Sequence, residues 1–313
     1  MAALILHHYG FSPFAEKIRL ALGLKKLSWL SVVQPSVMPK PGLVALTGGY
    51  RHIPVLQIGA DVYCDTRCIA RVLDRLHPTP PLLEPATRSL ATIVEAWAER
   101  DLFWPAARYV SGVNADTVDP QLHVDRAAMR GKRPPSHDRV KLVARRSLAQ
   151  LRPQLEVVEQ MLLAGRPFLL SQEPGQADLA VYHGLWFLSA LKIDCAAELS
   201  GFPLTRAWMA RVNAIGHGTP EDLSSDQALA IAAESSPVPV TDSIADDAMP
   251  SLGTEVSITP DGYTTEAVTG TLARFDLQDV SIRRNDASLG RVMVHFPRIG
   301  YTMKEAWILQ WPQ

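Results

Sequence analysis

The residues of this chain whose types and spacing could do chemistry lie in short segments. Ser12 begins a predicted helix, where its hydroxyl and the first helical N–H groups could stabilise a thiolate. In Ile53-Pro54 the proline cannot donate to a strand ladder, which leaves the backbone of Ile53 available to a peptide-like ligand. At the start of another predicted helix, the Thr66 hydroxyl and the N–H groups suit a carboxylate, while Asp65 suits an ammonium. These features predict a site for a ligand with a zwitterionic end and a peptide middle.

Strands and helices in a definite order must position these segments. Residues 3–7 and 29–33 read as strands, and the helix that starts at Ser12 runs between them to Leu24. Residues 53–58 and 61–64 then form a hairpin around Gly59, and a helix with one apolar face follows over 66–76. A β-α-β unit followed by a β-β-α unit is the thioredoxin-like arrangement, so we expect an α/β domain over residues 1–80.

The remainder of the chain changes character twice. Prolines clustered within residues 78–85 end the first domain, because they cannot continue a helix. Long amphipathic patterns, such as those over 88–103 and 140–163, predict an all-helical domain over residues 86–234. Residues 235–252 are rich in proline and aspartate and predict a linker. Alternating apolar residues within 253–313 predict a small antiparallel sheet or barrel, in which we find no functional motif.

The composition is that of an ordinary globular protein, with 47% hydrophobic and 20% charged residues. A net charge of −1 gives no electrostatic attraction to nucleic acid or to an anionic membrane, and no apolar run reaches the length of a membrane span. The three cysteines, Cys64, Cys68 and Cys195, lack the spacing of a disulfide framework, a zinc site or a redox motif, so we expect packing roles and no metal. Since the N-terminus carries no basic region and signal-length apolar stretch, we expect a cytoplasmic protein.

The run IPVLQIGADVYCDT resembles the glutathione-binding core of the glutathione S-transferase family, in which Val/Ile-Pro precedes a hairpin and then Glu/Asp-Ser/Thr. The run FSPFAEKIRLAL is similar to the motif of serine-type members such as the tau class. The resemblance covers about the first 235 residues. It implies a thioredoxin-like domain followed by an all-α domain, with the β domain as an unusual extension. It also implies glutathione as co-substrate, with its γ-glutamyl end at Asp65 and Thr66, its backbone along Ile53-Pro54 and its thiol at Ser12.

Other roles remain open for several of these residues. Ser12 could serve only as the N-cap of its helix, a position that serine favours. Tyr9 is a rival partner for the thiol, because other classes of the family use a tyrosine near the end of the first strand, and it is equally plausible as a strand-end aromatic. Lys40 and His52 lie near where tau-like members place cationic groups toward the glycine carboxylate. A lysine in a proline-rich loop is usually solvated, however, and a neutral histidine would bind a carboxylate by hydrogen bonding more than by charge.

In the family, the first long helix of the helical domain faces the cleft of the first domain. The resemblance therefore implies an acceptor pocket lined by aromatic and basic side chains, namely Phe11, Phe14, Trp104, Arg108 and Tyr109. An ordinary aromatic core would account for each of them at least as well.

The resemblance implies a glutathione transferase-like enzyme, which activates the glutathione thiolate for attack on an electrophilic, apolar small molecule. Glutathione-dependent peroxide reduction is a further reaction of the same class. A homodimer is expected by resemblance as well. The alternative from a different class is a non-catalytic glutathione- or ligand-binding module whose β domain recruits a partner. We expect neither nucleic acid nor a membrane as that partner.

Overall fold

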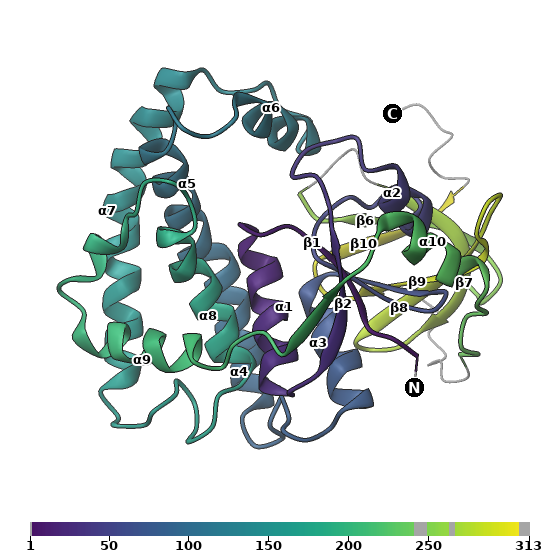
Figure 1. Cartoon of the computed structure of the whole chain (residues 1–313), viewed down its shortest axis with the longest axis horizontal. Coiled ribbons are helices and arrows are strands. Elements are labelled where there is room, and N and C mark those ends of the chain that lie inside the picture. Colours follow the sequence, from purple (N-terminus) through teal and green to yellow (C-terminus); the bar gives the residue numbers. More distant parts are fainter. Residues whose placement is uncertain (1, 241–248, 263–266, 307–313) are drawn as a thin grey trace.

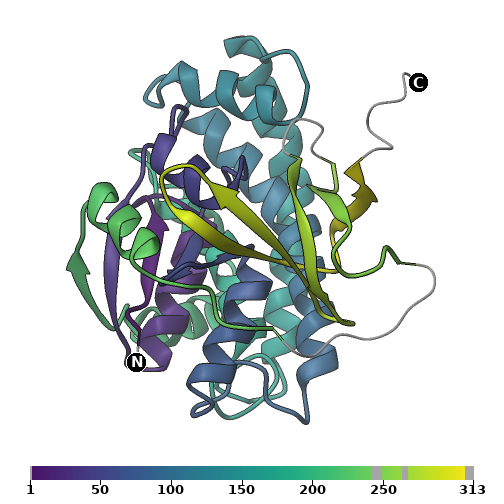
Figure 2. The same ribbon diagram turned by 90° about the vertical axis from the view of Figure 1, so that its right-hand side faces the viewer.

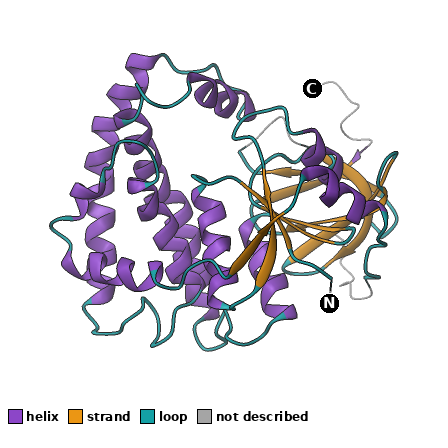
Figure 3. Ribbon diagram, in the orientation of Figure 1, coloured by secondary structure: helices purple, strands orange, loops and turns teal. Residues whose placement is uncertain are grey.

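A computed structural model describes residues 2–240, 249–262 and 267–306 of the chain. Helices form one half of the molecule and strands gather in the other half (Figures 1 and 3). The predicted combination of a thioredoxin-like unit, a helical unit and C-terminal strands is confirmed. Residues 241–248, in the middle of the predicted linker, lie outside the described part of the chain.

The thioredoxin-like unit has the predicted β-α-β and β-β-α order. β1 pairs in parallel with β2 and antiparallel with β3, which in turn pairs antiparallel with β4. Its helices begin where local chemistry favours a start, at a capping side chain or at a proline in the first turn. The elements are β1 (Ile5–His8), α1 (Pro13–Leu24), β2 (Ser28–Val33), α2 (Pro41–Thr47), β3 (Val55–Ile58), β4 (Asp61–Cys64) and α3 (Thr66–Leu76).

The helical unit follows the proline-rich segment. Its longest helix, α7, starts at a Ser136 cap, whose hydroxyl accepts a hydrogen bond from the Arg139 N–H group. None of the helices in the described ranges is both long and apolar enough to cross a membrane. The elements are α4 (Arg88–Trp97), a π-helix (Ala98–Leu102), α5 (Phe103–Val113), α6 (Pro120–Met129), α7 (His137–Leu162), α8 (Gln176–Trp186), two 3-10 turns (Phe187–Ser189 and Ala196–Leu199) and α9 (Pro203–Asn213).

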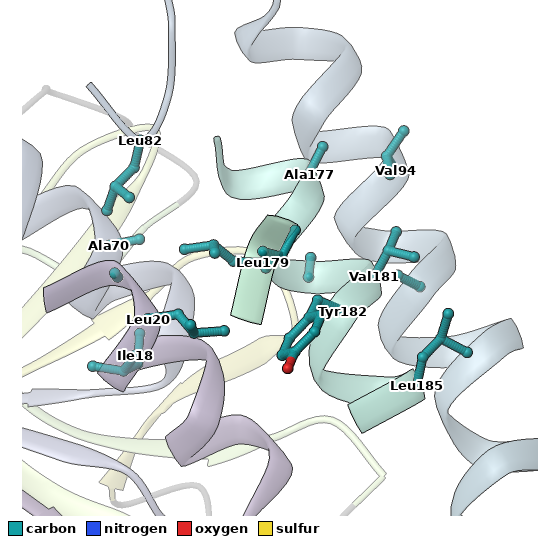
Figure 4. Packing of buried hydrophobic residues seen from close by; sticks show 14 of the residues in the cluster. Ile18, Leu20, Ala70, Leu82, Val94, Ala177, Leu179, Val181, Tyr182 and Leu185 are labelled. Carbon is teal, nitrogen blue, oxygen red and sulfur yellow. The ribbon is translucent and has the colours of Figure 1, made fainter. Parts of the chain in front are cut away.

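Helix α8 joins the two units because its side chains are buried on every side. In Figure 4, Leu179 lies toward Leu20 of α1, whereas Val181 lies toward Val94 of α4. The start of α8 is fixed by Asp178, whose carboxylate accepts hydrogen bonds from the Gly175 and Leu169 N–H groups at 3.0 and 2.9 Å. α8 therefore forms the core between α1 and α4.

The C-terminal strands continue the thioredoxin-like sheet instead of forming a separate one. β9 pairs in parallel with β4, with Tyr63 opposite His295, so that the described strands make one sheet in the order β10-β6-β7-β8-β9-β4-β3-β1-β2-β5. Figure 2, in which these strands face the viewer, shows them crossing in front of the thioredoxin-like unit. We call residues 249–306 the extension; its strands are β6 (Glu255–Pro260), β7 (Val268–Phe275), β8 (Asp279–Asp286), β9 (Gly290–Pro297) and β10 (Tyr301–Glu305).

Buried polar contacts fasten the extension to this sheet. The two ring nitrogens of His295 lie 3.0 Å from Asp61 Oδ1 and 2.8 Å from Ser281 Oγ, and all three residues are buried. Arg71 of α3 forms an ion pair with Asp279 at the start of β8. Because Ser281 is fully inaccessible, we interpret the Ser-His-Asp grouping as a structural network between strands, not as a nucleophile with its base.

Three further features differ from the patterns read in the sequence. α2 is an additional short helix after the proline-rich loop. β5 (Thr219–Asp222) pairs in parallel with β2, and α10 (Ser225–Ala233) packs on α2, so the chain returns to the thioredoxin-like unit before residue 234. The helix predicted over 88–103 is divided by the π-helix, and α5, with Pro105 in its first turn, continues directly from it.

Candidate functional site

Strand register brings the three predicted segments to one edge of the sheet. His7 of β1 lies opposite Val55 of β3, and Val55 lies opposite Cys64 of β4. The loop after β1, the residues before β3 and the residues after β4 must therefore meet at this edge. Ser12 follows β1, Ile53-Pro54 precedes β3, and Asp65-Thr66 follows β4.

Ser12 caps α1. Its hydroxyl oxygen accepts a hydrogen bond from the Ala15 N–H group at 3.2 Å, and the side chain is buried. Pro13 occupies the first helical position, and Glu16 N–H bonds to the Ser12 carbonyl at 2.9 Å. The capping bond uses the hydroxyl as an acceptor, so its hydrogen can still be donated to an anion held at the start of the helix.

Tyr9 lies beside Ser12, but its hydroxyl is hydrogen-bonded to the helical unit. Arg126 of α6 donates to the Tyr9 hydroxyl at 3.1 Å and to the Ser36 carbonyl at 2.9 Å. The rings of Tyr9 and Phe11 lie 4.8 Å apart. An adjacent ion pair, Arg51 with Asp125 at 2.9 Å, holds the same helix to the segment before β3.

The other residues predicted to contact the ligand lie at or near the segment before β3. The Ile53-Pro54 peptide bond is cis. The side chain of Lys40 is almost fully buried, with Nζ 3.4 Å from the Arg51 carbonyl and 6.0 Å from the Tyr9 ring centroid. His52 is half-buried, and its ring lies 5.0 Å from that of Tyr50. Both basic residues predicted from the sequence thus lie near the same edge.

Asp65 has an uncommon backbone conformation, with φ at 73° and ψ at 139°. A non-glycine residue with positive φ is held there by its surroundings and is frequent at binding sites. Oδ1 accepts a hydrogen bond from the Arg67 N–H group at 2.9 Å, so Asp65 caps α3. Oδ2 accepts a hydrogen bond from the Tyr301 hydroxyl of β10 at 3.2 Å. The extension therefore reaches the predicted site.

Thr66 joins a buried network of charges. Lys17 of α1 donates to Thr66 Oγ1 at 3.0 Å and forms ion pairs with Glu95 and Glu99 of the helical unit. Arg67 completes the network by pairing with Glu99 at 2.7 Å. Burial alone would lower the pKa of Lys17, but the two carboxylates outweigh it and raise that pKa. Burial would likewise raise the pKa of Glu99, but the Lys17 and Arg67 charges lower it to about 2. Lys17 and Glu99 therefore remain charged.

His183 of α8 lies next to this network without sharing it. It is fully buried, and neither ring nitrogen has a hydrogen-bonding partner among the residues that the structure describes. Burial, followed by the Lys17 charge, lowers the pKa of His183 to about 3, so the imidazole is neutral near pH 7. Its ring lies 4.7 Å from that of Phe14 and 5.6 Å from that of Phe103.

Most of the predicted acceptor residues form a connected aromatic row. Phe14 lies 4.9 Å from Phe103, which lies 5.3 Å from Trp104. Arg108 and Arg130 each place a guanidinium near the Trp104 ring, at 5.8 and 4.7 Å. This row links α1 to α5 and to the end of α6.

Two predicted acceptor residues lie outside this row, namely Phe11, whose ring lies 4.8 Å from that of Tyr9, and Tyr109. Its hydroxyl donates to Glu198 at 3.0 Å, and the same carboxylate pairs with Arg152 of α7. The side chain thus packs within the helical unit. Tyr109 follows Arg108 on the same helix, and adjacent helical residues point to different faces.

Sequence reasoning missed several side chains at this edge. Lys17 could have been noticed, because it lies between Phe14 and Ala21 on the apolar face of α1, where a charge signals a buried partner. No local pattern distinguishes Arg126, His183 or Tyr301. The buried thiols of Cys64 and Cys68 have pKa values raised by burial, which agrees with packing roles. Within the described residues no cluster of three or more histidine, cysteine or acidic side chains could hold a metal ion.

Comparison with known proteins adds independent information. Residues 6–81 match the family model described as "Glutathione S-transferase, N-terminal domain", and residues 123–215 match "Glutathione S-transferase, C-terminal domain". A GST-like protein from Pseudomonas syringae is 35% identical, and its crystal structure covers 97% of this chain and 100% of its own with a TM-score of 0.80. That similarity is long enough to include the extension.

More distant relatives match smaller parts. A glutathione S-transferase from Sinorhizobium meliloti 1021 is 19% identical, covers 68% of this chain and 88% of its own and has a TM-score of 0.52, which is a likeness of fold alone. FtsZ-localized protein A from Caulobacter vibrioides is 32% identical over 110 residues, which are 30% of this chain. The match spans 44% of that protein's length.

Proposed function

Since the chain belongs to the glutathione S-transferase family, we propose that it is a glutathione-dependent enzyme that activates the glutathione thiolate for attack on an electrophilic small molecule. One observation carries the proposal. Strand register brings the Ser12 loop, Ile53-Pro54 and Asp65-Thr66 to the same edge of the sheet. A tripeptide with a zwitterionic end and a central thiol matches the chemistry of these three segments.

Each part of glutathione has a proposed contact. The γ-glutamyl carboxylate meets Thr66 and the first N–H groups of α3, and its ammonium meets Asp65. The cysteinyl backbone pairs with the backbone of Ile53 in the manner of an added strand. The glycine carboxylate lies toward Lys40 and His52.

The thiol lies at Ser12 in this proposal. The hydroxyl, the first N–H groups of α1 and the helix dipole all stabilise a thiolate relative to the thiol. Lowering the thiol pKa from about 8.5 to about 7 corresponds to about 2 kcal/mol. In conjugation the sulfur lone pair forms the bond to the electrophilic carbon, and the leaving group departs with its bonding electrons. Phe11, Phe14, Trp104 and Arg108 contact the acceptor, which we propose to be apolar.

Calorimetric titration with glutathione, followed by a panel of electrophiles on the same samples, tests this function. We expect binding that Asp65→Asn weakens by about tenfold or more, because an ammonium then loses its charged partner. Asp101→Asn is the matched control, since Asp101 pairs with Arg100 at the surface of the helical unit. If glutathione does not bind, the assignment of the site is wrong. If it binds but no electrophile or peroxide is turned over, the enzymatic part is wrong.

A second candidate is a non-catalytic ligand-binding module whose extension engages another protein. The similarity to FtsZ-localized protein A favours this alternative, because that relative is named for its localisation with FtsZ. Co-sedimentation of the full chain with polymerised FtsZ, with and without glutathione, tests it. Specific co-sedimentation without any turnover would favour the module, whereas turnover without co-sedimentation would favour the enzyme.

We further propose a cytoplasmic homodimer, as family membership suggests. Leu90 and Ile93 lie one helical turn apart on α4, and both are largely exposed, which suits a surface that a second copy covers. Light scattering tests the assembly, because a dimer has twice the 34.4 kDa mass of one chain. A fluorescent fusion examined in the cell tests the location.

A further inference from the structure

The extension arrives at the Asp65 end of the site through sheet geometry. β9 runs parallel to β4, with Tyr63 opposite His295, so the end of β9 and the end of β4 lie at the same edge. Gly300 then turns the chain with φ at 85°, a conformation that favours glycine. The turn delivers the Tyr301 hydroxyl to Asp65 Oδ2 at 3.2 Å.

Tyr301 is held firmly in this position. Its ring lies 5.6 Å from that of Phe296, and its backbone pairs with Pro260 of β6. Its hydroxyl oxygen lies 3.2 Å from the Tyr50 hydroxyl. Burial, together with Tyr50 and the Asp65 charge, raises the pKa of Tyr301, so the phenol keeps its proton at neutral pH. Tyr301 is therefore a fixed hydrogen-bond donor.

Both oxygens of the Asp65 carboxylate are consequently oriented by neighbours. Oδ1 accepts from the Arg67 N–H group and Oδ2 accepts from Tyr301. An ionised carboxylate offers about four lone-pair positions, so these two bonds leave room for a ligand cation. Without the phenol, only the hydrogen bond at Oδ1 would restrict rotation of the Asp65 side chain.

We propose that the extension is part of the ligand site and that Tyr301 is a positioning residue, which orients Asp65 toward the ammonium of the γ-glutamyl group. This inference rests on the proposed function. Tyr301 lies 236 residues from Asp65 along the chain, yet it completes the same corner of the site. The extension thereby acts on recognition of the ligand as well as on the fold.

Calorimetry on the full chain with two ligands tests the inference. The ligands are glutathione and its analogue in which hydrogen replaces the γ-glutamyl amino group. We expect Tyr301→Phe to weaken glutathione binding about three- to tenfold, as is usual for a coupled hydrogen-bond network, and to leave the affinity for the analogue unchanged. Tyr182→Phe is the matched control, because that hydroxyl bonds to Asn213 inside the helical unit at 3.0 Å. It should change neither affinity.

Each other outcome overturns the inference in its own way. Equal weakening of the affinity for both ligands would mean that Tyr301 merely supports the fold. The melting temperature of Tyr301→Phe would then be lowered as well. Tighter binding of glutathione to Tyr301→Phe would mean that the phenol competes with the ammonium for Asp65. An unchanged affinity for both ligands would mean that Asp65 is oriented without it. If the wild-type chain does not bind glutathione at all, the proposed function fails first, and this inference fails with it.

Discussion

Ser12→Gly separates the two roles that Ser12 could have. In the structure its hydroxyl oxygen accepts the capping bond from Ala15 N–H, so any substitution that removes the hydroxyl also removes the cap. Glycine is tolerated at an N-cap and loses only a few tenths of a kcal/mol relative to serine, whereas alanine loses about 1 kcal/mol. Glycine therefore deletes the hydroxyl with little effect on the stability of α1.

The expected effect on chemistry is much larger than the effect on stability. If the hydroxyl is the main donor to the thiolate, the thiol pKa should rise from about 7 toward about 8.5. The thiolate fraction at pH 7 then falls roughly tenfold or more, which corresponds to about 2 kcal/mol. Ser12→Thr keeps both the hydroxyl and the capping ability, and it should retain most of the turnover.

The assay is kcat/KM for a chlorodinitrobenzene as a function of pH, beside thermal unfolding of the same variants. For wild type the rate should rise with pH through a midpoint near the thiol pKa of about 7, because only the thiolate attacks. For Ser12→Gly the midpoint should move up by about 1.5 units, and the rates should converge at high pH. Ser12→Ala should show the same midpoint as Ser12→Gly with a lower melting temperature.

One result would refute the reasoning directly. If Ser12→Gly keeps the wild-type rate and midpoint, the hydroxyl acts only as a cap. Tyr9→Phe then tests Tyr9 as the partner of the thiol, because loss of its hydroxyl would raise the midpoint of the pH–rate profile if that group stabilises the thiolate. A raised midpoint in Tyr9→Phe alone would assign the thiol to Tyr9, whose hydroxyl already accepts from Arg126.

Three further substitutions test the electrostatics by chemical denaturation. His183→Phe should stabilise the fold by about 1–3 kcal/mol at pH 7, because it removes a buried ring with unpartnered nitrogens. The pKa of His183 in the folded chain is about 3 and lies below its unfolded value, so on acidification the unfolded chain binds the proton first. The free energy of unfolding of wild type should therefore fall by about 2 kcal/mol between pH 7.5 and pH 5, whereas that of His183→Phe should not. An identical pH dependence in the two proteins would contradict this. Lys17→Met should destabilise by about 3–5 kcal/mol, because two buried carboxylates lose their shared cation, and a loss below about 1 kcal/mol would contradict it. Asp279→Asn should destabilise the fold by about 1–3 kcal/mol, because the largely buried Arg71 loses its charged acceptor. The exposed control Asp101→Asn should have no measurable effect. Equal effects of the two substitutions would mean that the Arg71–Asp279 ion pair does not stabilise the attachment of the extension.

Local patterns were sufficient for the elements of the thioredoxin-like unit. Alternation of apolar residues predicts β3 and β4, and a cap followed by a helical period predicts α1 and α3. The parallel pairing of β9 with β4 was not predictable in this way, because it joins residues 61–63 to residues 293–295. Both strands are apolar and buried, and such strands carry no sign of which neighbour they pair with.

The site was predictable to the same extent and for the same reason. Ser12, Ile53-Pro54 and Asp65-Thr66 each carry a local chemical signal, and strand register then brings them together. Residues that act from a distance carry no such signal. Arg126 is one of several arginines in a polar segment, and its contact with Tyr9 depends on where α6 docks. Single polar residues of this kind can be recognised only once the packing of the elements that carry them is known.

The extension shows how such long-range contacts change the design of an experiment. A composition-based linker and a change of period suggest an independent domain that could be removed to test partner recruitment. In the structure, however, removal would expose the β4 ladder, deprive Arg71 of its acceptor and take the Tyr301 hydroxyl from Asp65. A truncated chain would therefore lose both ligand binding and any partner, and the two losses could not be told apart. Substitution of an exposed side chain on the extension, such as Leu277, which is 81% accessible, leaves those three contacts in place. Loss of a partner with unchanged glutathione binding in Leu277→Asp would separate recruitment from catalysis, which deletion cannot do.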